Sequence, residues 1–123
     1  MFDRALWLVL AAGHMMPVMS VFRPGMLEQL YGLALQGDLA TLMRHRGALF
    51  LAVVIVAVWC AFDPRVRMLG LAVLSTSLIG FLALYLIGGS SPGLRQIALV
   101  DVALIPILAI AAFRTISASN SGV

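Results

Sequence analysis

Residues 43–67 read MRHRGALFLAVVIVAVWCAFDPRVR. The part from Gly47 to Phe62 carries no charge, and β-branched residues fill its centre. A helix needs about 20 mostly apolar residues to cross a bilayer core about 30 Å thick, so we predict a crossing from about Met43 to Phe62. Asp63-Pro64 then ends this helix and starts the next one, which predicts that the two helices are antiparallel neighbours.

The composition of the whole chain agrees with this segment. Of the 123 residues, 63% are hydrophobic and 11% are charged, and the mean hydropathy is +1.09. Polar side chains are therefore too few to cover a core in water. The eight basic residues are arginines scattered over loops and helix ends, which argues against nucleic-acid binding. The single cysteine, Cys60, excludes an intrachain disulfide and a cysteine-based metal site.

Four apolar runs are long enough to cross a bilayer, at about residues 5–22, 43–62, 66–87 and 93–113. We therefore predict an all-α fold, an integral membrane four-helix bundle that forms a single domain over residues 1–116. A short helix at residues 26–31 is predicted to lie at the interface between the first two spans, and Asp38 is predicted to cap the second span. Residues 117–123 are polar and predict a disordered tail.

The orientation follows from the arginines beside the spans. Four arginines fall on each side of the membrane, so the raw count is a tie. The tie breaks toward cytoplasmic termini if Arg44, Arg46 and Arg95 face protein rather than lipid headgroups. We therefore expect a multi-pass membrane protein with both termini in the cytoplasm. The N-terminal apolar run continues past a signal-peptide length, which predicts a retained anchor.

Several polar residues share one depth in this arrangement. His14 precedes Phe22 by eight residues and Asp101 follows Gly93 by eight, so both are predicted about 12 Å below the non-cytoplasmic surface. A buried ionised Asp is costly unless it pairs, so we expect Asp101 to face the bundle. One alternative is that Asp101 and an arginine form a purely structural pair that sets the helix register. Another is that the arginines of the Arg44–Arg46 segment contact lipid phosphate at the interface.

Two prolines lie beside this polar level. Pro17 removes the hydrogen bond that would reach the Gly13 carbonyl, and Pro106 does the same for Val102. Such broken turns are tolerated in lipid where a neighbouring helix, a hydroxyl or water satisfies the freed carbonyl, which suits the lining of a cavity.

We assign expected roles on this basis. His14 and Asp101 are the candidate catalytic pair. The candidate ligand-binding residues are Arg44, His45, Arg46, Tyr31, Ser77, Tyr85 and Arg95. No metal site and no cofactor is indicated by the sequence.

The segments Leu30–Gly32, Leu42–Phe50 and Gly88-Gly89 with Leu94-Arg95, together with Asp101, carry a resemblance. On these residues the chain resembles small bacterial four-helix inner-membrane proteins of about this length. Some of those proteins are labelled phosphopantetheine adenylyltransferase, an activity that needs a phosphate-binding loop on an α/β sheet, which this sequence lacks. More distantly the chain is similar to DoxX-like membrane proteins, which implies quinone or redox partners.

Three functions remain open from the sequence. The leading hypothesis is a polar intramembrane pocket in the non-cytoplasmic half that binds an amphiphilic small molecule such as a lipid, quinone or isoprenoid. In this pocket an arginine binds the head of the ligand and the loop near Tyr31 acts as a lid. The second is a small membrane enzyme that uses His14 and Asp101 for isomerisation or ring opening of an apolar substrate. The third is an accessory subunit of a larger membrane complex, against which a lone monomer or a homo-oligomer would count. Homo-oligomers and larger membrane complexes both stay open as partners.

Overall fold

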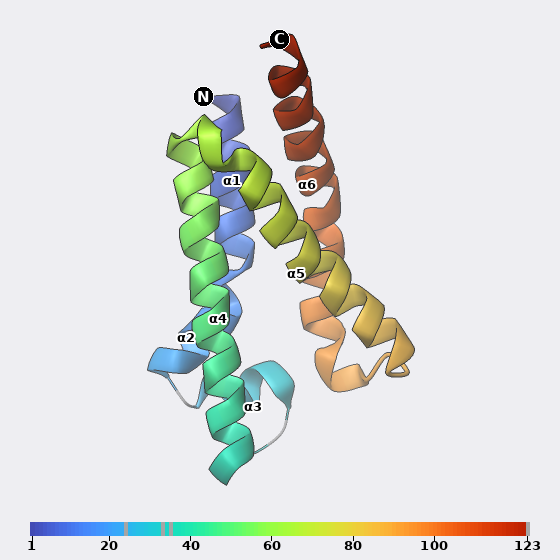
Figure 1. The fold of residues 1–123 in the computed structure, drawn as a ribbon. Helices are drawn as coiled ribbons and strands as arrows, with labels where there is room; N and C mark the ends of the chain where they lie inside the picture. The colour runs from blue at the N-terminus through green and yellow to red at the C-terminus, as the bar shows by residue number, and fades with distance from the viewer. Residues whose placement is uncertain (24, 33, 35, 123) are drawn as a thin grey trace.

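A computed structural model describes residues 1–123 apart from residues 24, 33, 35 and 123, and the side chains of residues 27, 30 and 31 also lie outside the described part. The described residues form helices and no strand, in agreement with the predicted all-α class (Figure 1). In chain order the elements are α1 (Phe2–Gly13), α2 (Met15–Phe22), α3 (Met26–Tyr31), α4 (Gly37–Phe62), η1 (Pro64–Val66), α5 (Arg67–Ile87), η2 (Pro92–Leu94) and α6 (Arg95–Ser121).

Among the described residues, three helical segments are long and apolar enough to cross a membrane, and they end at Phe62, Ile87 and Ser121. The helices α1 and α2 have 12 and 8 residues, so each is too short alone and they pass the same test only when they are taken together; a bend of 46° separates them. The fold therefore holds three candidate spans, or four when the bent pair counts as one.

The bend between α1 and α2 lies at His14. The backbone N–H of His14 donates to the Ala11 carbonyl at 3.1 Å, which tightens the last turn of α1. Pro17 follows three residues later and has no N–H to give to the carbonyl of Gly13, so the helical hydrogen bonding cannot run through this point. The sequence predicted an interruption here, and the structure confirms its place.

The helices pack closely at the end of the molecule that carries both termini (Figure 1). Trp7 and Cys60 are buried there, and Gly70 of α5 lets the helices approach. A Cβ atom at Gly70 would overlap the Cys60 sulfur and lie 3.0 Å from the Trp7 ring. Asp3 also links helices at this end, since its carboxylate pairs with Arg67 at 3.2 Å and with Arg114 of α6.

The opposite end is more open. Helix α4 packs along α1 and α2, whereas α5 packs along α6 and leans away from α4 with distance from the termini (Figure 1). Gly47 brings α4 close to α2, because a Cβ there would lie 2.7 Å from the Pro17 carbonyl oxygen. Helix α3 contacts α2 and η2, and Met26 and Leu94 belong to one small hydrophobic cluster near this open end.

Two local predictions differ from the structure. Helix α4 begins at Gly37 with Gln36 as its N-cap, so Asp38 lies in the first turn rather than at the cap. An acidic side chain in that turn still interacts favourably with the helix dipole. Helix α6 runs through Pro106 and continues to Ser121, where a disordered tail was predicted. It ends at Gly122, the first glycine or proline after Pro106. The Ser121 hydroxyl donates to the Ser117 carbonyl at 2.8 Å.

Candidate functional site

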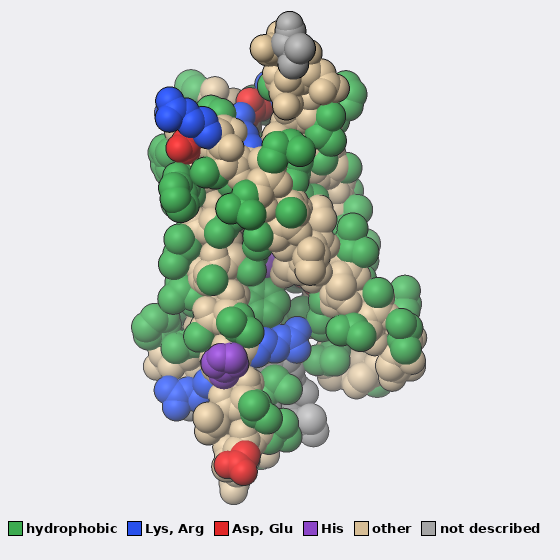
Figure 2. Space-filling model, in the orientation of Figure 1, with side chains coloured by type: hydrophobic (Ala, Val, Ile, Leu, Met, Phe, Trp, Pro, Cys, Tyr) green, Lys and Arg blue, Asp and Glu red, His purple; other side chains and the backbone are tan. Residues whose placement is uncertain are grey.

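A large cavity lies between α4 and α5, in the half of the molecule away from the termini. Its volume is about 660 Å³. The space-filling view shows this face covered mainly by hydrophobic side chains and hollowed between the two helices (Figure 2). The cavity is lined by Arg46, Leu49, Phe50, Val53, Val73, Thr76, Ser77, Gly80, Phe81, Leu84, Tyr85 and Leu94.

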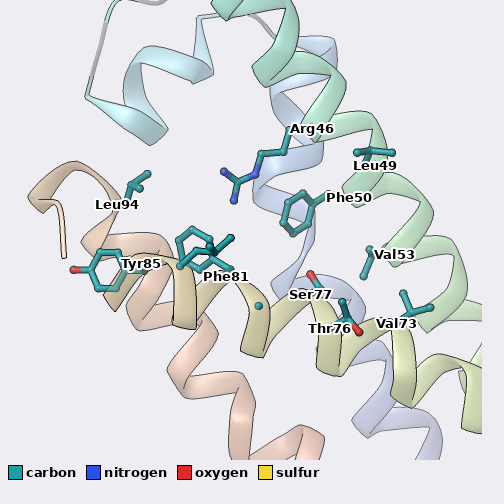
Figure 3. A pocket seen from close by; sticks show the side chains of 12 residues that line it. Arg46, Leu49, Phe50, Val53, Val73, Thr76, Ser77, Phe81, Tyr85 and Leu94 are labelled. Carbon is teal, nitrogen blue, oxygen red and sulfur yellow. The ribbon is translucent and has the colours of Figure 1, made fainter. Parts of the chain in front are cut away.

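Arg46 is the one charged side chain on this lining. It extends from α4 toward α5 (Figure 3). The guanidinium carbon lies 5.6 Å from the centre of the Phe50 ring and 5.4 Å from that of Phe81. Both distances are within the range of a cation–π contact. No carboxylate forms an ion pair with Arg46 among the described residues.

Aromatic and hydroxyl groups continue the lining along α5. Phe81 and Tyr85, one turn apart, stack with ring centres 6.2 Å apart. Thr76 gives its hydroxyl proton to the Ala72 carbonyl at 2.8 Å, a common arrangement for Thr in a helix. Ser77 and Tyr85 were predicted as ligand-binding residues, and both line this cavity with Arg46.

His14 and Asp101 line a second, much smaller cavity between the α1–α2 bend, α4 and α6. Its volume is about 20 Å³. The equal spacing of the two residues from their helix ends predicted a common level, and the structure places them on one cavity. Phe50 lines both this cavity and the large one, and its ring centre lies 5.8 Å from that of His14. Phe50 therefore contacts both His14 and Arg46.

The other predicted residues do not converge on the large cavity. Arg44 is exposed and donates to the Val21 carbonyl at 3.2 Å, so it joins α4 to α2. His45 is exposed on the surface of α4. Arg95 lies with Tyr85 on a separate cavity of about 280 Å³ between α5 and α6. Tyr31 ends α3, and its side chain lies outside the described residues.

Sequence reasoning missed the aromatic partners Phe50 and Phe81. A helical spacing of four residues places two side chains on one face, so the pairs Arg46/Phe50 and Phe81/Tyr85 carried a usable signal. The same geometry explains why Arg44 and His45 point elsewhere. Successive residues on a helix are turned by about 100°, so three in a row cannot face one cavity.

Comparison with protein-family models, curated proteins and solved structures finds no match for this chain. A functional assignment therefore depends on the geometry and chemistry of the cavities.

Proposed function

We propose that this protein crosses the membrane four times, with α1 and α2 as one broken span, and that the cavity between α4 and α5 binds an amphiphilic small molecule. Lipids, quinones and isoprenoids are the ligand classes that fit. The observation that carries the proposal is the position of Arg46, a guanidinium on the wall of a largely apolar cavity of about 660 Å³.

The electrostatics of Arg46 favour a ligand with an anionic or carbonyl head. A charge held among apolar groups is destabilising unless a partner compensates it. The faces of two phenyl rings lie near the guanidinium and offer only weak compensation, so an oxygen acceptor from a ligand stabilises the site further. Arg donors form a planar fork that matches a carboxylate or a phosphate, which adds geometric selectivity to the attraction.

The size and surroundings of the cavity favour the apolar part of the same ligand. Pockets for drug-sized molecules occupy about 300–1,000 Å³ and are mostly apolar, with a few placed polar groups. The present cavity falls in that range, and exposed Leu49 and Leu84 stand at its margin. In a four-span arrangement these side chains face the acyl chains, so the ligand enters sideways between α4 and α5.

We place the protein in the bacterial inner membrane with cytoplasmic termini, in keeping with its resemblance to small four-helix proteins of that membrane. Both termini lie at one end of the molecule (Figure 1), as an even number of crossings requires. Arg44, Arg46 and Arg95 were the three arginines expected to face protein. Of these, Arg46 lines the large cavity, whereas Arg44 and Arg95 are exposed. Arg67 faces protein at the termini end in the same way, since it is largely buried and paired with Asp3, so three arginines remain beside the spans at each end and their count favours neither orientation.

The enzyme hypothesis has one observation in its favour, the shared cavity of His14 and Asp101. That cavity of about 20 Å³ has room for about one water and for no substrate. Acid–base chemistry on an apolar substrate therefore requires the side chains that line this cavity to move apart first. Ligand binding at Arg46 requires no such movement and is the better supported function.

Native mass spectrometry of the detergent-purified protein tests the proposal. We expect the wild-type chain to retain a lipophilic molecule and R46Q to lose it. The matched control is R23Q, which removes an exposed arginine from the same end of the molecule and leaves the cavity intact. Equal retention by the wild type and both variants, or no bound species in any of them, would overturn the proposed site.

A further inference from the structure

The small cavity at the α1–α2 bend is lined by the imidazole of His14. His14 is 2% exposed, and its Nδ1 lies 2.8 Å from the Leu10 carbonyl oxygen. Because a carbonyl oxygen only accepts hydrogen bonds, Nδ1 carries the proton in this contact. In the neutral ring Nε2 is then an acceptor with a free lone pair.

This Nε2 atom is buried and has no hydrogen-bond partner among the described residues. Such atoms are uncommon in native proteins, since leaving a buried acceptor without a hydrogen bond is destabilising. His14 lies on the wall of the cavity of about 20 Å³. The described residues on this wall include no second histidine and no cysteine. The atom that satisfies Nε2 must therefore be a donor small enough for this space.

Two further groups at the cavity need hydrogen-bond partners. Asp101 lies on its wall and forms no ion pair or hydrogen bond with the described side chains. Gly13 also lies there, and Pro17 lacks the N–H that would otherwise bond its carbonyl. A cavity needs about 10–15 Å³ and two or more polar partners to hold a water, and this cavity meets both conditions.

We propose that the cavity binds one ordered water, which donates one hydrogen to His14 Nε2 and the other to the carboxyl group of Asp101. The bridge joins the broken first span to α6 at a point where Pro17 has removed a backbone hydrogen bond. It also makes His14 and Asp101 one hydrogen-bonded unit, next to the Phe50 ring that also lines the ligand cavity at Arg46.

The chain contains only two histidines, which makes a nitrogen-15 NMR experiment direct. In the H45Q protein, labelled on histidine and held in detergent micelles, every ring signal belongs to His14. We expect a proton on Nδ1, an Nε2 signal shifted as in a hydrogen-bonded acceptor, and a cross-peak from the ring to a water proton that does not exchange within the mixing time.

The pair D101L and D101N then identifies the second partner. We expect D101L to move the Nε2 signal to that of an unbonded nitrogen, and D101N to keep most of the hydrogen-bond shift because its amide still bonds a water. D38L, an exposed change in the first turn of α4, serves as the matched control and leaves the signal unchanged. An unbonded Nε2 in H45Q itself would overturn the proposal, and so would a signal that D101L leaves in place. The H45Q result does not depend on whether D101L folds.

Discussion

The guanidinium of Arg46 lies 5.6 Å from the ring centre of Phe50, one turn further along α4. The same ring lies 5.8 Å from the imidazole of His14. One aromatic side chain thus borders both the cavity that we propose for the ligand and the small polar cavity beside α6. Apart from Phe50, different residues line the two cavities, so substitutions can test each cavity separately.

Filling the large cavity without changing its charge isolates the role of its volume. Gly80 lies on the cavity wall, and a Cβ built there meets no atom within 4 Å. We expect G80L to fold normally and to retain several-fold less of the bound amphiphile, because its side chain occupies the space of the ligand. Retention is measured by quantitative lipid mass spectrometry, with G80A as the control of small volume. Undiminished retention in G80L would remove the cavity as the binding site.

The phenyl rings beside Arg46 are expected to hold it in position. F50L and F81L each remove one cation–π contact, worth about 0.5–1 kcal/mol at an exposed site, so affinity should fall about two- to fivefold in each variant. Titration of the delipidated protein with a fluorescent fatty acid measures this change. F113L, at an exposed phenylalanine of α6, should bind like the wild type. A loss of the same size in F113L would mean that the rings act through general stability.

Gly70 is expected to be essential to helix packing at the end of the molecule that carries both termini. In G70A the new methyl group overlaps the Cys60 sulfur and presses on the Trp7 ring, and overpacking of this kind costs about 1–3 kcal/mol. Thermal unfolding in detergent should show a clear drop in midpoint. G80A on the same helix provides the comparison, because its methyl group meets nothing and Ala favours a helix by up to about 1 kcal/mol. Equal midpoints for the two variants would contradict the described packing.

Asp3 is expected to stabilise the termini end without affecting the ligand. Its carboxylate joins α5 through Arg67 and α6 through Arg114. D3N should lower the free energy of unfolding by about 1 kcal/mol, since the pairs are partly exposed to solvent. D38N, an exposed change at the other end, should have no effect on stability. Loss of bound amphiphile in D3N would show that the two ends of the molecule are coupled, which the account does not predict.

The topology can be tested with reporter fusions in bacteria. With an even number of crossings and cytoplasmic termini, a fluorescent protein at either terminus should fluoresce, and alkaline phosphatase at either terminus should stay inactive. Opposite results at the two termini would contradict four spans. Active phosphatase at both termini would keep the four spans and reverse the orientation.

The sequence predicted the main helices and their turns because long apolar runs and turn residues such as Asp63-Pro64 determine local structure without help from distant residues. The start of α4 was predicted two residues too late, with Asp38 in place of Gln36 as the N-cap, because both side chains are polar and only the backbone shows which of them precedes the first turn. At the site, spacing along the chain placed His14 and Asp101 at one level. It could not show that α5 leans away from α4, because that lean depends on packing between helices far apart in sequence. The large cavity and the partners of Arg46 therefore required the structure.

Photochemical mapping of the bound ligand tests the central claim most directly. A fatty acid with a diazirine in its chain is bound to the wild-type protein, irradiated, and located by peptide mass spectrometry. The account predicts labelling of cavity-lining residues of α4 and α5, concentrated between residues 73 and 84, and loss of that labelling in R46Q but not in R23Q. Labelling spread evenly over the outer faces, including Leu99 and Phe113 of α6, and unchanged in R46Q would contradict it.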